Sequence, residues 1–261
     1  EVQTKPRKRL FAHTMYMHGA KGNVSYTEFK YMGHDSLLGR YTVHPHQMKD
    51  NSRGMVLRGN GLWYTGNRWI NIHSSNGILI EDNVGYQSAN TGYYMEWDFD
   101  ISLNPQNPIP LPGINLDLIF IHNLGVRVEH PNLDAGSFAG QFADVFYLDG
   151  DPSTVVMGNV ASGAGAGSSN TGGFQTTGGF RTFLNNEAHS NYSAGLRHYV
   201  NNNPPNDSVG LHVWRNIGGF GPGSYTGFFP MFQSSFIDNS SGAGLGTINY
   251  FFQDNLFEGN A

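Results

Sequence analysis

An internal repeat constrains the fold of this 261-residue chain more than any other feature. Short apolar segments recur along the whole sequence, and a glycine often introduces them, as at Gly54, Gly77, Gly92, Gly195 and Gly210. Others lead into an asparagine turn, as at Asn83, Asn159, Asn239 and Asn255. Such self-similarity is typical of solenoids, in which each coil buries its apolar face only against the neighbouring coils.

The repeated segments have the pattern of short strands. Apolar side chains alternate along them, so that one set points inward. Asparagine tolerates the left-handed backbone of a corner and can stack on the asparagine of the next coil as an amide ladder, while glycine provides the other positive-φ corners. We therefore predict an all-β fold, a right-handed parallel β-helix, with residues 1–261 as a single domain. A β-sandwich or a propeller is the alternative.

Three stretches interrupt the repeat and are predicted to be long loops that leave the stack. Residues 101–116 contain four prolines, which exclude a central strand. Residues 161–179 are rich in Ala, Gly, Ser and Thr, and residues 201–208 are rich in Asn and Pro. Loops on one side of a solenoid commonly form the wall of a binding groove.

Charge is sparse and unevenly distributed. Residues 1–68 carry 11 of the 15 Lys and Arg residues but only 4 of the 20 Asp and Glu residues. This segment could attract a polyanion, or it could be a solvated basic arm followed by scattered surface arginines. Because the remainder is acidic, we predict no nucleic-acid partner.

Two absences narrow the possibilities further. The chain contains no cysteine, so neither disulfides nor thiolate chemistry can operate. It also contains no apolar run of the roughly 18 residues that a membrane-spanning helix needs, and we predict no membrane insertion. The oligomeric state is not indicated by any pattern in the sequence.

Reactive side chains are densest between residues 40 and 98. The alternation in 41–46 places Thr42, His44 and His46 on one face of an extended segment. One coil later, Asn71 and His73 face outward if Ile70 and Ile72 are buried. A third coil, 93–98, would bury Met95 and expose Tyr94, Glu96 and Asp98. Since coils stack about 4.8 Å apart, these histidines and carboxylates are expected on one outer sheet.

Two chemistries suit that set. His44, His46 and His73 with Glu96 could hold a divalent metal, and imidazole nitrogens favour a transition metal over calcium. Alternatively, Glu96 and Asp98, with Glu81 or Asp82 nearby in sequence, could act as the acid and base of glycoside hydrolysis.

Structural roles are the competing interpretation. His44 and His46 could cap turns or stack as a ladder, His73 could form a turn, and Glu96 and Asp98 could be a solvated face. His13 precedes His44 by about one coil and could extend the histidine column.

Several blocks of the chain resemble one known family. They are 12–15, 32–34, Leu38 to His46, Asn67 to His73, Leu79 to Tyr86 and Tyr94 to Asp98, with further likeness at 158–163, 185–191, 194–196 and 236–239. These blocks resemble the β-helix region of the cell-migration-inducing hyaluronan-binding protein family, which includes the transmembrane hyaluronidase and bacterial proteins with a G8 domain. The resemblance covers most of the chain.

The resemblance implies a parallel β-helix and depolymerisation of hyaluronan or a related extracellular polysaccharide by a secreted or cell-surface protein. It also associates activity with calcium. The family usually has proline where this chain has Thr42, an aromatic residue where it has Pro45, and a glycine after the acidic pair where it has Trp97. The family's G8 domain is absent, so a fragment of a longer protein is expected.

The leading functional hypothesis is a polysaccharide depolymerase, either a glycoside hydrolase or a lyase, that acts on an anionic glycan. Its expected catalytic groups are Glu96, Asp98 and His73, and its expected metal ligands are His44, His46, His73 and Glu96. Substrate is expected to contact Arg40, Tyr41, Arg68 and Trp97, with Arg58 as a further candidate. In the lyase variant, a histidine or Tyr41 removes the C5 proton. The alternatives are a non-catalytic carbohydrate-binding solenoid that grips sugars through Trp63, Tyr64, Trp69 and Trp97, and a purely structural surface protein.

Overall fold

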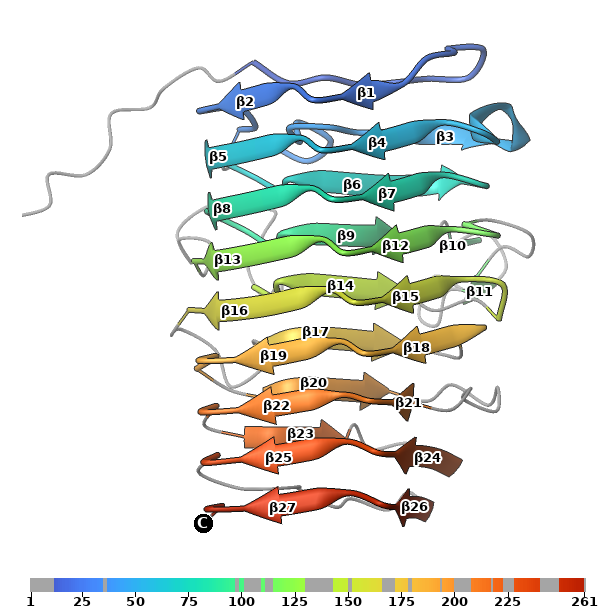
Figure 1. Cartoon of the computed structure of the whole chain (residues 1–261). Helices are drawn as coiled ribbons and strands as arrows, with labels where there is room; N and C mark the ends of the chain where they lie inside the picture. Colours follow the sequence, from blue (N-terminus) through green and yellow to red (C-terminus); the bar gives the residue numbers. More distant parts are fainter. Residues whose placement is uncertain are drawn as a thin grey trace, which may run out of the picture.

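The computed structural model describes most of the chain as a stack of β-strands with one short helical turn, η1 (Asp50–Ser52). The described residues are 12–34, 37–96, 99–100, 109–110, 115–129, 143–149, 152–165, 172–177, 180–192, 194–199, 208–216, 218–222, 228–239 and 249–260. Successive coils pile up along one axis from the N-terminal to the C-terminal end (Figure 1).

Three parallel sheets run along this axis, and each of the first seven coils contributes one strand to each sheet in turn (Figure 1). Sheet 1 has the order β1 (Val24–Ser25), β4 (Val56–Arg58), β7 (Leu79–Glu81), β12 (Ile119–Ile121), β15 (Val155–Met157), β18 (Thr182–Leu184), β21 (Ser208–Val209), β24 (Phe228–Phe232) and β26 (Asn249–Gln253). Sheet 2 has the order β2 (Glu28–Lys30), β5 (Gly61–Thr65), β8 (Val84–Ser88), β13 (Leu124–Val128), β16 (Val160–Ala164), β19 (Glu187–His189), β22 (His212–Trp214), β25 (Ser235–Ile237) and β27 (Leu256–Glu258). Sheet 3 consists of β3 (His46–Lys49), β6 (Ile70–Ser75), β9 (Tyr93–Glu96), β14 (Phe146–Asp149), β17 (Gly172–Thr177), β20 (Ala194–Tyr199) and β23 (Gly218–Pro222).

The parallel pairing confirms the predicted β-helix and excludes the sandwich and the propeller, whose neighbouring strands are antiparallel. Within the described residues, the antiparallel pair is β10 (Phe99–Asp100) with β11 (Ile109–Pro110), which lies outside the three sheets. In the interior, equivalent side chains of successive coils stack, as the rings of Tyr93, Phe146 and Phe174 do at 4.6 and 4.8 Å between centroids. Each coil therefore buries its apolar side chains against its neighbours.

Asparagine ladders join the coils at the corners, as the sequence predicts. Between sheets 1 and 2, each Nδ2 donates to the Oδ1 of the asparagine one coil further on, at 2.9–3.1 Å, through Asn60, Asn83, Asn123, Asn159 and Asn186. A second ladder, Asn191, Asn216, Asn239 and Asn260, lies between sheets 2 and 3 at 2.8–3.1 Å. The amide groups are thus satisfied inside the corner and hold adjacent coils in register.

The left-handed corners differ from the prediction in one respect. Many positive-φ corner residues are not glycines. At the corner between sheets 2 and 3, the equivalent positions of successive coils, with φ between 51° and 70°, are Tyr31, Tyr64, Gln87, Arg127, Gly163, Ser190, Arg215, Asp238 and Gly259. The corner conformation is therefore set by the coil geometry, and side chains of many kinds are held in it.

The loop predicted at 161–179 is wrong for 161–164 and 172–177, and residues 166–171 and 178–179 lie outside the described residues. Its first residues belong to β16, and Gly172–Thr177 form β17 in the middle of sheet 3. Small residues fit this part of the stack because they lie against neighbouring backbone: a Cβ on Gly173 would come within 2.7 Å of the Gly195 carbonyl oxygen. Residues 101–108, 111–114 and 201–207, which carry most of the other two predicted loops, lie outside the described residues.

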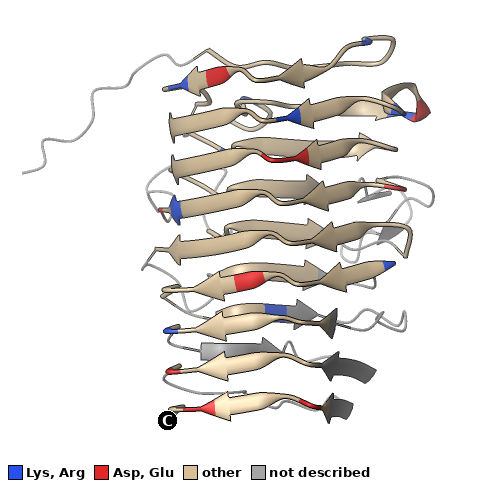
Figure 2. Cartoon of the chain, viewed as in Figure 1, with Lys and Arg blue, Asp and Glu red and all other residues tan. Residues whose placement is uncertain are grey.

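Few charged side chains lie on the strands of the stack (Figure 2). The basic cluster at residues 5–9 lies outside the described residues. No helix in the described part of the chain is long or apolar enough to cross a bilayer.

Replacement of Asn159 by alanine should destabilise the stack. Asn159 accepts from both the backbone and the side chain of Asn123 and donates to the Phe120 carbonyl. Because these buried groups would lose their partners, we expect the free energy of unfolding to fall by about 3 kcal/mol. Urea unfolding measures this, with Asn51→Ala as an exposed control that should change stability by less than about 0.5 kcal/mol. Equal effects of the two substitutions would contradict the role of the ladder.

Candidate functional site

The outer face of sheet 3 carries the histidines that the sequence singled out. His46 in β3 pairs with His73 in β6, and His73 pairs with Glu96 in β9. Ile72 and Met95 are fully buried on the inner side of the same strands. The predicted stacking of these three coils is therefore confirmed at the level of the backbone.

The register of β3 against β6 is irregular just after His46. His46 opposes His73, but Lys49 opposes Ser75, so β3 contains one extra residue and Gln47 adopts a φ of 49°. Such bulges bend a strand and redirect its side chains, and they are common beside functional sites. This bulge lies immediately beside the histidine pair.

Three imidazole rings meet at this point. The Nδ1 atoms of His46 and His73 are 3.0 Å apart, and their ring centroids are 4.7 Å apart. The His44 ring lies 4.8 Å from that of His46 and is parallel to that of His73 at 6.2 Å. One nitrogen from each of the three rings lies within 4.8 Å of the other two. We call these three residues the His cluster.

His44 is held as a neutral imidazole with a defined tautomer. Its Nδ1 donates to the Gly39 carbonyl at 3.1 Å, so Nε2 carries the lone pair. Only 1% of the residue is exposed, and Nε2 has no hydrogen-bond partner among the described residues. Burial is the main cause that lowers the pKa of His44 from 6.5 to about 3, and the nearby His46 and His73 add to it.

The His cluster fits a transition-metal ion. A metal-ligating histidine typically donates its second ring nitrogen to a carbonyl or carboxylate, as His44 does to Gly39, and offers the other nitrogen to the metal. An unpartnered, buried Nε2 on a neutral ring meets that requirement. Metal–nitrogen bonds of about 2.0–2.1 Å place tetrahedral ligand nitrogens roughly 3.3 Å apart, so only small ring movements separate the cluster from such a site. The nitrogen donors do not suit calcium.

Tyr41 and Arg68 lie beside the cluster but are buried. Both are 1% exposed, and the Arg68 guanidinium carbon lies 4.6 Å from the Tyr41 ring centroid and 3.5 Å from that of Tyr94. Arg68 also donates to Asn71 Oδ1 at 2.6 Å. The Tyr41 ring contacts His44 edge-on at 4.7 Å. Because both side chains are buried and pack against His44 or its neighbours, they can fix the position of the cluster.

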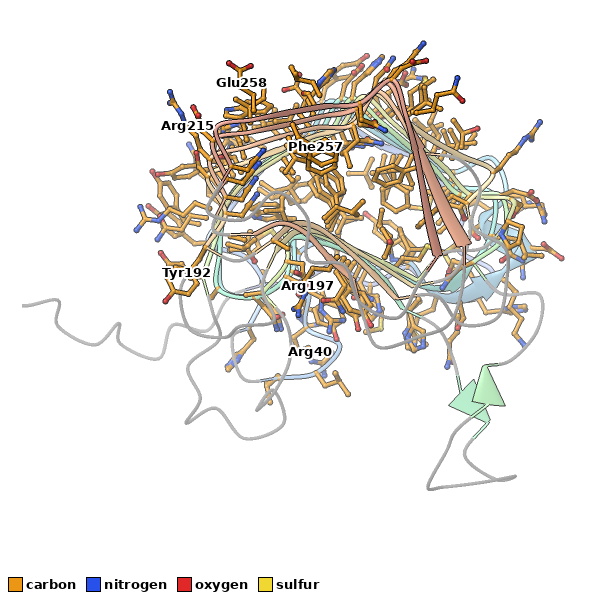
Figure 3. All side chains as sticks on the ribbon, turned by 90° about the horizontal axis from the view of Figure 1, so that it is seen from below. Arg40, Tyr192, Arg197, Arg215, Phe257 and Glu258 are labelled. Carbon is orange, nitrogen blue, oxygen red and sulfur yellow. The ribbon has the colours of Figure 1, made fainter. Side chains whose placement is uncertain are left out.

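Arg40, by contrast, is exposed. Its guanidinium donates to His13 Nε2 at 2.9 Å. The parallel bridge of Tyr16 to Pro45 puts Met15 opposite His44, so His13 does not extend the histidine column. Figure 3 shows Arg40 and Arg197 on the outer side of sheet 3, whereas Phe257 points into the interior. Arg40 is thus a cation on the same side of the molecule as the His cluster.

Four other candidates lie elsewhere. Trp69 is fully buried, where its ring occupies the space that a Cβ on Gly85 or Gly92 would need. Glu81 belongs to sheet 1 and pairs with Arg58 at 2.6 Å, and Asp82 at the next corner lies 3.7 Å from His122. Glu81 and Asp82 therefore do not join Glu96, contrary to the expectation from their closeness in sequence.

Part of the predicted site cannot be placed. Trp97 and Asp98 lie outside the described residues, and of Glu96 only the backbone is described. The register nevertheless puts the Glu96 position in the column of His46 and His73.

The sequence did not single out Asp144, which lies further along the same outer face. Asp144 is fully buried, and neither carboxyl oxygen makes a hydrogen bond of normal geometry within the described residues. Burial raises the pKa of Asp144 well above its usual range, and the nearby Arg197 opposes this only in part. The sequence shows only that Asp144 directly precedes the apolar residues of β14, and this context does not indicate that its carboxyl group is buried.

The family comparison falls on this part of the molecule. Residues 10–98 match a family model described as CEMIP beta-helix. This span contains the whole His cluster, the Gly39 carbonyl that orients it and the Arg68 group beside it.

Curated relatives extend the CEMIP likeness beyond that span. Over 211 residues, 65% of this chain, the sequence is 28% identical to the Mus musculus protein named Cell migration-inducing and hyaluronan-binding protein, of which 14% is covered. It is 24% identical to the Danio rerio protein named Cell surface hyaluronidase over 225 residues, which are 67% of this chain and 15% of that protein. Fibrocystin-L of Mus musculus is 29% identical over 75 residues, 29% of this chain and 2% of the relative.

The burial of His44 predicts a specific pH dependence for the metal-free protein. In the unfolded chain His44 takes up a proton near pH 6.5, but in the folded chain it does so only near pH 3. Above pH 6.5 the His44 ring is neutral in both states and its titration does not affect stability. Between pH 6.5 and about 3 only the unfolded chain takes up this proton, so the free energy of unfolding falls as the pH drops. Within this window the wild type should lose up to about 1.4 kcal/mol per pH unit more than His44→Gln. Chemical unfolding at a series of pH values tests this, and parallel curves for the two proteins would refute it.

Proposed function

We propose that the outer face of sheet 3 binds an anionic polysaccharide of the hyaluronan type and cleaves it with the help of a metal held by the His cluster. The observation that carries the proposal is the neutral, buried His44 with an unpartnered Nε2 beside His46 and His73. The CEMIP relatives supply the ligand class, because their names include hyaluronan binding and hyaluronidase activity.

In this proposal, His44, His46 and His73 hold a divalent transition metal, and Glu96, next in the same column, completes the set as a ligand or as an acid or base. A metal bound there would act as a Lewis acid on a carboxylate or a glycosidic oxygen of the glycan. Tyr41 and Arg68 keep the cluster in place, because they pack against His44 and against Asn71 in the adjoining coil.

The glycan is proposed to contact the exposed side of the same face. Arg40 is the best-placed described cation, and it can exchange the neutral His13 for a uronate carboxylate, which accepts two hydrogen bonds from one guanidinium. Trp97, which follows β9 in the sequence, is proposed as a stacking residue. Tyr41 and Arg68, with 1% exposure each, serve the substrate only indirectly.

Proton transfer is assigned to Glu96, Asp98 and His73. His73 is partly exposed and shares a hydrogen bond with His46, so it can pass a proton between the cluster and a bound ligand. Hydrolysis needs a carboxylic acid beside the leaving oxygen, and a lyase needs a base at C5 of the uronate. Because the Tyr41 ring is buried against His44, a histidine is the better candidate for that base. A secreted or cell-surface protein would encounter such a substrate.

A non-catalytic carbohydrate-binding role is the second candidate. The observation that favours it is a group of exposed aromatic side chains at the corner between sheets 2 and 3, which includes Tyr31 and Tyr64.

Metal binding can be measured without any activity. Titration of the metal-free protein with Zn²⁺, Ni²⁺ or Cu²⁺ by calorimetry should give one site per chain, and His44→Ala and His46→Ala should each weaken it more than about tenfold. His212→Ala is the matched control, because His212 is an exposed histidine of sheet 2. Unchanged metal affinity in both His44→Ala and His46→Ala would contradict the assignment of the metal to the His cluster.

Cleavage is tested by incubating the chain with high-molecular-weight hyaluronan and following chain length by size-exclusion chromatography. His73→Ala and Glu96→Gln should each slow depolymerisation about 100-fold or more, because each removes a proton-transfer group or a ligand. His212→Ala should cleave at the wild-type rate. Wild-type rates in both His44→Ala and Glu96→Gln would show that the reaction, if present, takes place elsewhere.

A further inference from the structure

Four aromatic side chains form a shelf at the corner between sheets 2 and 3, near the N-terminal end of the stack. They are Tyr31, Tyr64, Trp63 and Tyr86, and we call them the aromatic shelf. Tyr31 and Tyr64 stack at 5.6 Å between centroids and 17° between planes. Tyr86 contacts Tyr64 edge-on at 5.6 Å and lies 6.2 Å from Trp63. Three successive coils thus contribute one continuous aromatic surface.

Two rings of the shelf are exposed to solvent. Tyr31 and Tyr64 are 48% and 44% exposed, so core packing does not account for them. Both occupy left-handed corner positions, with φ of 55° and 54°. The other coils place glycine or a polar or charged side chain at the equivalent corner, as at Gly163, Ser190 and Asp238, so the left-handed conformation itself does not call for an aromatic residue. Exposed aromatic rings at these two corners therefore indicate a role outside the protein's own stability.

Cations flank the shelf at both ends. Lys30 precedes Tyr31 and pairs with Glu28 at 2.8 Å on the surface. Arg127, two coils beyond Tyr64 in the same corner, donates to the Tyr86 hydroxyl and lies 3.1 Å from Glu129. Both ion pairs are about half exposed, so either cation can turn to another anion at little cost.

This combination fits one ligand chemistry. The apolar faces of pyranose sugars pack against exposed aromatic rings, and rings from successive coils, about 4.8 Å apart, give an extended polysaccharide a continuous apolar surface along the axis. Lys30 and Arg127 add charge complementarity to carboxylates at either end. A protein partner would be expected to need a larger apolar area than four rings that are still partly exposed.

We propose that the aromatic shelf is a second polysaccharide-binding site, separate from the His cluster, that packs the outward sides of its rings against an anionic glycan lying along the helix axis. The ligand class rests on the proposed function, but the site itself rests on the shelf. It would hold a long chain on the protein while another part of the chain occupies the outer face of sheet 3. Short oligosaccharides, which cannot reach both sites, would depend on it less.

The test uses the whole chain, a Tyr31→Asn/Tyr64→Asn double variant and a Tyr26→Asn control. Asparagine tolerates the left-handed corner, so the double variant should unfold at or above the wild-type temperature. Tyr26 is matched, since it is exposed and has a φ of 54°, but its ring lies over Gly59 at another corner. Binding of metal-free protein to immobilised hyaluronan should weaken about tenfold in the double variant and stay unchanged in Tyr26→Asn.

Further outcomes of this experiment distinguish binding at the aromatic shelf from the cleavage proposed for the His cluster. Binding that survives in His46→Ala but falls in the double variant supports the shelf, whether or not any cleavage is detected. Equal loss in the double variant and in Tyr26→Asn, or loss in His46→Ala alone, overturns it. No binding by the wild type, or equal binding of an uncharged chitin oligosaccharide, overturns the anionic-glycan assignment. If the wild type cleaves hyaluronan, the double variant should show a raised KM for long chains and an unchanged rate on short ones.

Discussion

The hydrogen bonding of each coil to the next is the constraint on which the rest of the molecule depends. Backbone ladders in three sheets and amide ladders at the corners fix the same register from coil to coil. A slip of one residue would turn every side chain of a strand to the opposite face. Because the register holds, residues about 25 apart in sequence, such as His46 and His73, become neighbours. The candidate site is therefore built by stacking.

Covering of the outer face changes the chemistry of that site. On an open sheet, His44 would be a solvated imidazole. Here the Gly39 carbonyl, five residues before it, accepts a hydrogen bond from its Nδ1. Burial then keeps the ring neutral and leaves Nε2 without a partner. The Arg68 guanidinium, placed against the rings of Tyr41 and Tyr94, occupies the adjoining volume. A surface histidine has in this way acquired the features of a metal ligand.

The two proposed binding surfaces use the same coils in different ways. The outer face of sheet 3 presents imidazoles that can act on a ligand, whereas the corner beside sheet 2 presents aromatic rings that can hold one. The solenoid allows this division because each coil passes both surfaces once per turn. Both surfaces belong to the first coils, which are also the part of the chain with the excess of Lys and Arg.

The sequence by itself determined the architecture and the approximate position of the site. Alternation and asparagine turns are local, so the strands, the ladders through Asn83, Asn159 and Asn239, and the stacking of residues 40–98 could be read directly. The tertiary structure decided which of those residues face water. Alternation alone puts Trp69 and Arg68 on opposite faces without saying which is inside, and it gives no sign that His44, Tyr41 and Asp144 are covered. The small residues of β16 and β17 suggested a loop, because nothing local shows that a neighbouring backbone needs the space. Burial on an outward face depends on how the preceding residues turn back over it and on the side chains of the next coil, as Gly39, Tyr41 and His73 do for His44, and alternation carries no record of either.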